Sequence, residues 1–187
     1  MKIKWTVGPL FVAGLCALYC ANPMNLFWPF FWACALHELG HFIAIFSFGK
    51  TVEAVKLGAL GAVIETQTLS YPEELVCSLA GPAVNLVCAA GLQRAAPAFA
   101  ILSLLLALFN LLPLYPLDGG RALQALMRWC FGETACRICM TACRAIVCTA
   151  LVAGAVWATC IRHYGMWPAL LAAVVLAKLD GTSRSEK

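Results

Sequence analysis

The chain has 187 residues, of which 63% are hydrophobic and 12% are charged, and its net charge is +4. A soluble domain of this length does not carry so large an apolar fraction, so the composition excludes one and predicts a polytopic membrane protein. The length suits a single domain without a second folded module, and we expect no nucleic-acid partner.

Six apolar segments are predicted to cross the membrane as helices of about 15–25 residues. In chain order they are Trp5–Cys20, Asn25–Phe48, Leu75–Leu92, Pro97–Leu114, Cys143–Ile161 and Gly165–Lys178. If the N-terminus is cytoplasmic, every Lys and Arg except Arg94 and Arg162 lies on the inner side or at its rim. This positive-inside asymmetry predicts a multi-pass protein of the cell membrane with both termini in the cytoplasm.

The first segment has a second interpretation, as a cleaved secretory signal with Lys2 and Lys4 as its basic start. No clear cleavage site of the small-x-small type follows it, so a transmembrane helix is favoured.

The second segment contains His37-Glu38-Leu39-Gly40-His41, an HExxH sequence in apolar surroundings. On a helix, this spacing sets two imidazoles one turn apart to hold Zn²⁺ and a carboxylate beside them to take a proton from the metal-bound water. The alternative is a chance pentad whose histidines satisfy each other in a helical core. Ionisable groups at membrane depth cost roughly 2.5–3.5 kcal/mol each on insertion scales, which favours the functional interpretation.

The loop after the second segment is rich in β-branched residues over 50–57, with Gly58 and Gly61 ahead of a second short run at 62–65. It predicts a β-hairpin at the membrane surface, with an irregular connector as the alternative. A free strand edge there could pair with an extended peptide. The predicted fold class is therefore an all-α polytopic membrane protein of about six transmembrane helices with one short hairpin after the second.

Two histidines leave zinc short of a protein ligand, and few acids lie within the predicted spans. Outside the loops, boundaries and tail, only Glu38 and Asp118 remain. Asp118 follows Pro113 and Pro116, which break the helix, and precedes Gly119-Gly120, which permits a tight turn. By contrast, Glu73 and Glu74 open the third segment and are interpreted as helix caps.

The chain has 11 cysteines, most of them inside apolar spans where a thiol packs as a small hydrophobe. Cys136, Cys139 and Cys143 could bind a metal, but their spacing is equally that of one helical face. Such free use of cysteine fits a reducing cytoplasm.

Three motifs together resemble the site-2 proteases, the intramembrane zinc metalloproteases of peptidase family M50. They are HELGH at 37–41, Ala-Gly-Pro-Ala-Val-Asn at 80–85, and Asn-x-x-Pro-x-x-Pro-Leu-Asp-Gly-Gly-Arg at 110–121. The resemblance implies zinc ligands His37, His41 and Asp118, with Glu38 as the general base. It also offers Asn85 and Asn110 as contacts to a substrate carbonyl or the oxyanion, although either amide could simply join neighbouring helices.

Within this family the layout is similar to the stage IV sporulation protease group, which lacks a PDZ domain but usually carries a CBS domain that is missing here. The resemblance implies a bacterial enzyme acting on a membrane protein, such as a sigma-factor precursor or an anti-sigma factor, in the lipid bilayer under an inhibitory membrane partner. Two competing hypotheses are a metal transporter using the same ligands as a transit site and a non-catalytic scaffold. The transporter does not explain Glu38 beside His37, and a scaffold would normally show damage to the HExxH or LDG motif.

Overall fold

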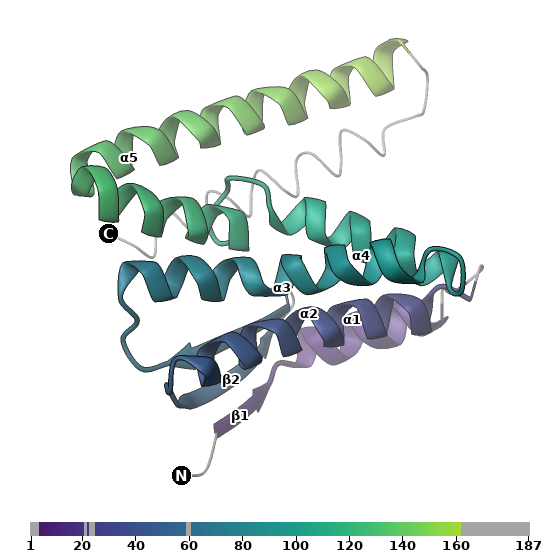
Figure 1. The fold of residues 1–187 in the computed structure, drawn as a ribbon. Helices are drawn as coiled ribbons and strands as arrows, with labels where there is room; N and C mark the ends of the chain where they lie inside the picture. Colours follow the sequence, from purple (N-terminus) through teal and green to yellow (C-terminus); the bar gives the residue numbers. More distant parts are fainter. Residues whose placement is uncertain (1–3, 21, 23–24, 59–60, 162–187) are drawn as a thin grey trace. The chain divides into compact units, whose positions relative to one another are not determined.

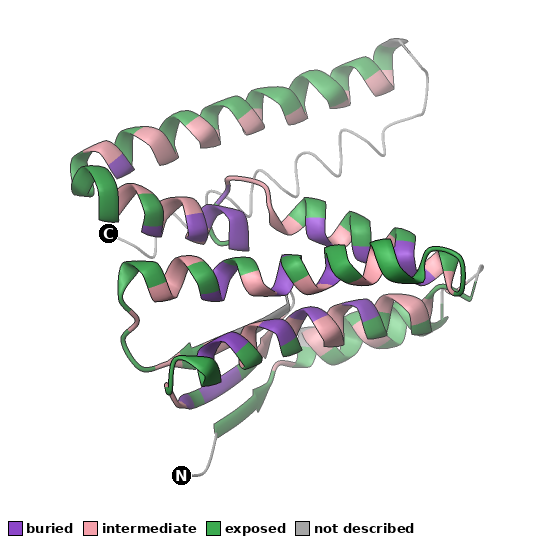
Figure 2. Cartoon of the chain, in the orientation of Figure 1, coloured by how far each residue is buried: buried purple, intermediate pink, exposed green. Residues whose placement is uncertain are grey.

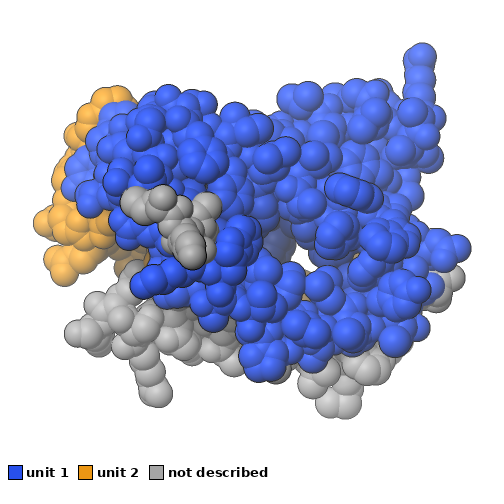
Figure 3. Space-filling model, turned by 90° about the horizontal axis from the view of Figure 1, so that it is seen from below, with its two compact units in different colours: residues 1–112 blue, residues 113–187 orange. Residues whose placement is uncertain are grey.

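The computed structural model describes residues 4–20, 22, 25–58 and 61–161. The chain divides into two compact units, Met1–Leu112 and Pro113–Lys187 (Figure 3). The first unit holds most of the secondary structure (Figure 1). Its elements are β1 (Lys4–Val7), α1 (Pro9–Cys20), α2 (Phe27–Ser47), β2 (Val52–Gly58), β3 (Gly61–Thr66), α3 (Tyr71–Leu92) and α4 (Pro97–Asn110).

Helices α2, α3 and α4 pack side by side in the first unit, and their buried positions face one another (Figures 1 and 2). Small residues allow the close approach of α2 and α3. A Cβ atom added at Gly40 would lie only 2.8 Å from the Ala80 carbonyl oxygen. The interface also buries polar side chains, with Asn85 and Ser103 at 0% exposure. Close packing therefore brings α3 directly against the helix that carries the HExxH sequence.

The strands form one sheet in the order β1-β2-β3, with β2 antiparallel to β3 and in register from Ala54–Glu65 to Gly58–Gly61. The predicted hairpin is thus confirmed. Its apolar face packs on the end of α2 and the start of α3. The buried residues of this cluster are Ala44, Ile45, Val52, Val55 and Cys77. The hairpin is therefore anchored to the two helices that flank it in the sequence.

The prediction that a helix begins at Trp5 is wrong, whereas the predicted mainly helical fold with a short hairpin is confirmed. Residues Lys4–Val7 form β1, which pairs in parallel with Ala54–Leu57 of β2. The Gly8 amide extends this pairing by donating to the Leu57 carbonyl oxygen at 2.8 Å. The strand supplies backbone hydrogen bonds that the first turn of a helix would leave unmade. Helix α1 consequently starts at Pro9 and has 12 residues.

Three helical stretches among the described residues are long and apolar enough to cross a membrane: Phe27–Ser47, Tyr71–Leu92 and Asp118–Cys160. Helices α1 and α4 are apolar but shorter. The predicted span Gly165–Lys178 lies outside the described residues, so the count of six is not confirmed. Large apolar side chains are exposed along these helices, including Val87 at 73%, as expected where a bilayer replaces water.

The second unit contains α5 (Asp118–Val156) and a π-helical turn at Trp157–Ile161. Helix α5 is broken at Gly132, whose φ of 81° is readily adopted by glycine alone. Its two segments fold back on each other (Figure 1), and the Cys136 thiol lies 3.7 Å from the Gln124 carbonyl oxygen. Arg128 closes the corner by donating to the Glu133 carboxylate at 2.8 and 3.3 Å. The predicted span Cys143–Ile161 is therefore only part of a longer, bent helix.

Candidate metal centre

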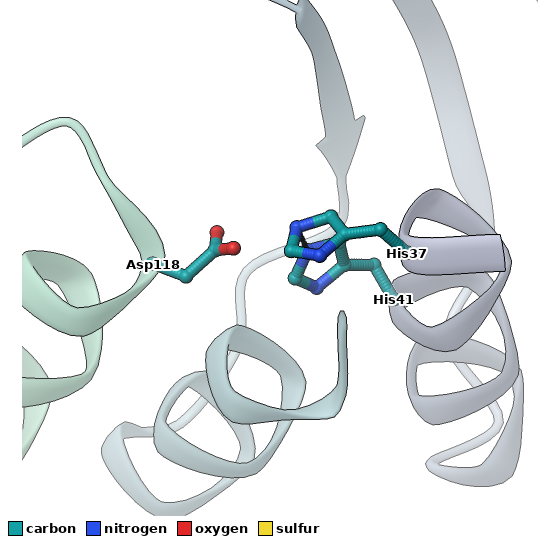
Figure 4. Close-up of side chains that lie close together, drawn as sticks. All are labelled: His37, His41 and Asp118. Carbon is teal, nitrogen blue, oxygen red and sulfur yellow. Dashed lines mark hydrogen bonds between the residues drawn. The ribbon is translucent and has the colours of Figure 1, made fainter. Parts of the chain in front are cut away.

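His37 and His41 lie one turn apart on α2, and their rings extend from the same face of the helix (Figure 4). Their Nε2 atoms are 3.2 Å apart. Two nitrogens bound to one tetrahedral zinc at 2.0–2.1 Å would be separated by about 3.3–3.4 Å. The pair therefore has the spacing that a shared zinc ion requires, to within about 0.2 Å.

The Nδ1 atoms of both rings are held by α3. The His41 Nδ1–H donates to the Cys77 carbonyl oxygen at 2.8 Å, and His37 Nδ1 lies 3.3 Å from Asn85 Nδ2. Zinc-binding histidines commonly have their second ring nitrogen engaged in this way, which orients the ring. Nothing in the HExxH sequence itself identifies Cys77, because it contributes only a backbone carbonyl.

Gly81 leaves the space that these nitrogens need. A Cβ atom there would lie 2.4 Å from His41 Nε2 and 2.9 Å from His37 Nε2, closer than side chains pack. A glycine at this point of α3 thus lets the backbone pass beside the potential ligand atoms. In the sequence, Gly81 is marked only by its place in the Ala-Gly-Pro-Ala-Val-Asn motif at 80–85. The motif by itself does not predict that this glycine lies against the histidines.

Glu38 is half-buried on α2, next in the chain to His37. Asp118, the other acid retained from the sequence, is the first residue of α5 and is 8% exposed. Its carboxylate stands at the helix N-terminus (Figure 4), where the unpaired backbone N–H groups favour negative charge. Gly120 holds this helix start against the preceding turn, since a Cβ atom there would lie 2.3 Å from the Leu114 carbonyl carbon.

The remaining candidates have different surroundings. Asn110 donates from Nδ2 to the Leu106 carbonyl oxygen of its own helix at 3.0 Å, and Asn85 contacts His37. Glu73 accepts a hydrogen bond from the Ser70 amide at 2.7 Å, as its interpretation as a cap requires. The thiols of Cys136, Cys139 and Cys143, all within the described part of α5, form no metal-ligand group with one another.

Part of the chain matches a known protein family, and two proteins of known name are similar to it. Residues 87–153 match the sequence profile of peptidase family M50. A zinc metalloprotease of Methanocaldococcus jannaschii is 29% identical over 66% of this chain, and a Synechocystis protein named as a candidate zinc metalloprotease is 36% identical over 49%.

The chain is thus similar to peptidase family M50 over residues 87–153 and to proteins named as zinc metalloproteases. It spans 41% and 28% of the lengths of these two relatives. The solved structure of a site-2 protease from Methanocaldococcus jannaschii shares the fold, with a TM-score of 0.67 and 22% identity over 97% of this chain and 91% of the other. The imidazole pair and the similarity to peptidase family M50 fit a zinc ion as the metal.

Proposed function

We propose that this chain is an intramembrane zinc metalloendopeptidase. It hydrolyses a peptide bond of a membrane-embedded or membrane-associated protein near the cytoplasmic face. The observation that carries the proposal is the pair of Nε2 atoms 3.2 Å apart on an apolar, membrane-length helix. Placing two imidazoles within such a helix costs free energy, so a functional role is expected for them, and binding a shared zinc ion is such a role.

The proposed ligands are His37, His41 and Asp118. All three are candidate metal ligands of the right chemistry, two neutral imidazole nitrogens and one carboxylate oxygen. Three protein ligands leave a fourth position of a tetrahedral zinc ion open, which is the arrangement of catalytic rather than structural sites.

Glu38 is the proposed general base. When bound, zinc would polarise the scissile carbonyl and lower the pKa of a coordinated water to about 7. The Glu38 carboxylate would accept a proton from the attacking water and deliver it to the leaving amine nitrogen. Asn110 would stabilise the developing oxyanion or hold a substrate carbonyl with Nδ2, after releasing its bond to Leu106.

The substrate is proposed to enter as an extended strand along β3. This strand is at one edge of the three-stranded sheet, since it pairs with β2 on one side only among the described residues. An extended peptide can add to such an edge through main-chain hydrogen bonds. Extension is also needed for the chemistry, because a helix keeps its carbonyls in internal hydrogen bonds.

The proposed context is a bacterial cell membrane, with both chain termini in the cytoplasm because of the positive-inside asymmetry. The motif layout supports a regulatory substrate, such as a sigma-factor precursor or an anti-sigma factor, and control by an inhibitory membrane partner. A sporulation role rests on that resemblance alone.

The deciding experiment co-expresses the chain with a panel of tagged single-span membrane proteins and compares wild type with Glu38→Gln. Cleavage by wild type alone supports the protease. Equal cleavage by both variants would remove Glu38 from the mechanism. If no panel member is cleaved and purified protein instead carries Zn²⁺ into proteoliposomes, the chain is a transporter.

A further inference from the structure

The hydrogen-bonding direction of β2 determines which backbone groups of β3 face the open edge of the sheet. The Leu57 carbonyl oxygen accepts from the Gly8 amide at 2.8 Å, so Leu57 directs its backbone groups toward β1. Residues paired across an antiparallel ladder either exchange both hydrogen bonds or exchange neither. Ala62, the partner of Leu57, therefore turns its N–H and C=O away from β2, and so does Ile64 two residues later. These are the groups that an added strand would bind.

The two faces of the hairpin differ in polarity. The Ile64 side chain packs against the apolar cluster of the hairpin, α2 and α3, so its face of the sheet is covered. Successive side chains of a strand point to opposite faces, so Glu65 lies on the other face, where it is exposed. Its carboxylate accepts a hydrogen bond from Lys56 Nζ of β2, and both side chains are about half exposed. An added strand would accordingly place alternate side chains toward the helices and beside Glu65.

Glu65 is the only charged residue in the sequence of β3. A strand added to the edge would lie about 4.8 Å from β3, whereas Lys56 belongs to β2, one strand further away. A carboxylate has two oxygens with about four acceptor sites, so Glu65 can accept from a second cation beside Lys56. Opposite charges on neighbouring strands stabilise the pairing, and like charges destabilise it. The charged residue directly beside an added strand is thus an acid.

We propose that the edge of β3 selects an extended substrate segment with a Lys or Arg side chain beside Glu65. This inference rests on the proposed function, because it gives the strand-addition site a charge preference. The proposed cut lies near the cytoplasmic face, where segments next to membrane spans are enriched in Lys and Arg. The basic side chain contacts Glu65 from the open edge, while the backbone of the same segment binds Ala62 and Ile64.

Two alternating peptides test this preference without a known substrate. Fluorescein-labelled peptides of four Val-Lys or four Val-Glu repeats place all charges on one face when extended. The valines can then face the helices while the charges lie on the side of Glu65. Dissociation constants are measured by fluorescence anisotropy with the purified Glu38→Gln chain in a neutral detergent, so that bound peptide is not cut.

The Val-Lys peptide should bind more tightly than the Val-Glu peptide. Adding Glu65→Gln should weaken Val-Lys binding by roughly 2–5-fold, the usual size of one cross-strand charge pair, and Glu65→Lys should reverse the preference. Glu53→Lys is the matched control, because Glu53 is an exposed acid of β2 and the substitution changes the net charge equally. It should leave the preference for Val-Lys in place.

A backbone variant tests whether the peptides bind at this edge. Ile64→Pro removes one outward-facing donor and should weaken both peptides, whatever their charge. Unchanged binding in Ile64→Pro would overturn the proposal by placing the peptides elsewhere, and failure of both peptides to bind the parent chain would overturn it as well.

The charge preference has its own contradicting outcomes. Equal affinities of the parent chain for the two peptides would overturn it. A reversal in Glu53→Lys as large as in Glu65→Lys would also overturn it, because the net charge of the chain would then explain the result. If Glu65→Lys does not fold, Glu65→Gln decides alone, since it removes the charge with little change of shape.

Peptide binding and cleavage are measured separately, so the two proposals can fail independently. If no co-expressed membrane protein is cleaved in a manner that depends on Glu38, while Val-Lys binding depends on Glu65, only the proposed function fails. If Glu38-dependent cleavage is found but neither peptide responds to Glu65→Gln, only the charge preference is contradicted.

Discussion

His37 Nδ1 and Asn85 Nδ2 lie 3.3 Å apart although 48 positions separate the two residues in the sequence. The contact joins the middle of α2 to the middle of α3, on the face of α3 that also carries Gly81. One side of α3 therefore supplies the carbonyl, the amide and the side-chain-free surface against which both histidines are oriented.

Glu38→Gln should retain zinc and lose cleavage. The substitution removes no proposed ligand but cannot accept a proton, and general-base catalysis contributes about 10²–10⁴-fold in rate. Zinc content by atomic absorption and cleavage of a co-expressed membrane substrate are measured on the same preparations, with His41→Ala as the variant that should lose both. Activity near wild type in Glu38→Gln would assign the base to another residue.

Asp118→Ala should lower zinc affinity as well as activity. Removing a proposed direct ligand should raise the zinc dissociation constant by more than the roughly 10–100-fold expected for losing a residue that only hydrogen-bonds to a ligand. Glu53→Gln, at an exposed acid of β2, is the comparison variant and should leave zinc binding unchanged. Full zinc occupancy of Asp118→Ala under chelator competition would place Asp118 outside the coordination sphere.

Gly81→Ala should abolish zinc binding, whereas Gly91→Ala in the same helix should not. A Cβ atom at Gly81 would overlap both Nε2 atoms, but one at Gly91 meets nothing within 4 Å. Alanine is also the better helix former by about 0.5–1 kcal/mol, so Gly91→Ala should match or exceed wild type in thermal stability. Normal zinc affinity in Gly81→Ala would mean that α3 does not approach the histidines closely in the membrane.

Proline substitutions in β3 should impair cleavage without removing zinc. Neighbouring residues of an edge strand direct their N–H groups alternately toward the paired strand and away from it. Of Val63→Pro and Ile64→Pro, one therefore removes a donor to β2 and the other a donor available to a substrate strand. Cleavage and zinc are measured together for both variants. Normal cleavage by both variants would show that the hairpin only connects α2 and α3 and does not bind substrate. Loss of zinc in either variant would indicate that this variant is misfolded.

Local features of the fold could be predicted because they depend on short-range periodicity. The HExxH spacing places His37 and His41 on one helical face whatever packs against it, since residues four apart are neighbours on any α-helix. The hairpin of β2 and β3 followed from β-branched residues and the two glycines between them. The M50 motifs likewise led directly to His37, Glu38 and Asp118.

Only the tertiary structure decided which partners those residues meet. Trp5 belongs to a strand because β1 pairs with a segment some 50 residues later, a contact with no local signature. In the same way, the acceptor for His41 is the backbone of Cys77, and any residue type would present that carbonyl. The contact between Asn85 and His37 depends on α2 and α3 packing closely enough at Gly40 and Gly81 for the Asn85 amide to reach the ring. Periodicity identifies which face of a helix carries chemistry, but the orientation of each ring comes from hydrogen bonds between helices, which exist only once the helices have packed.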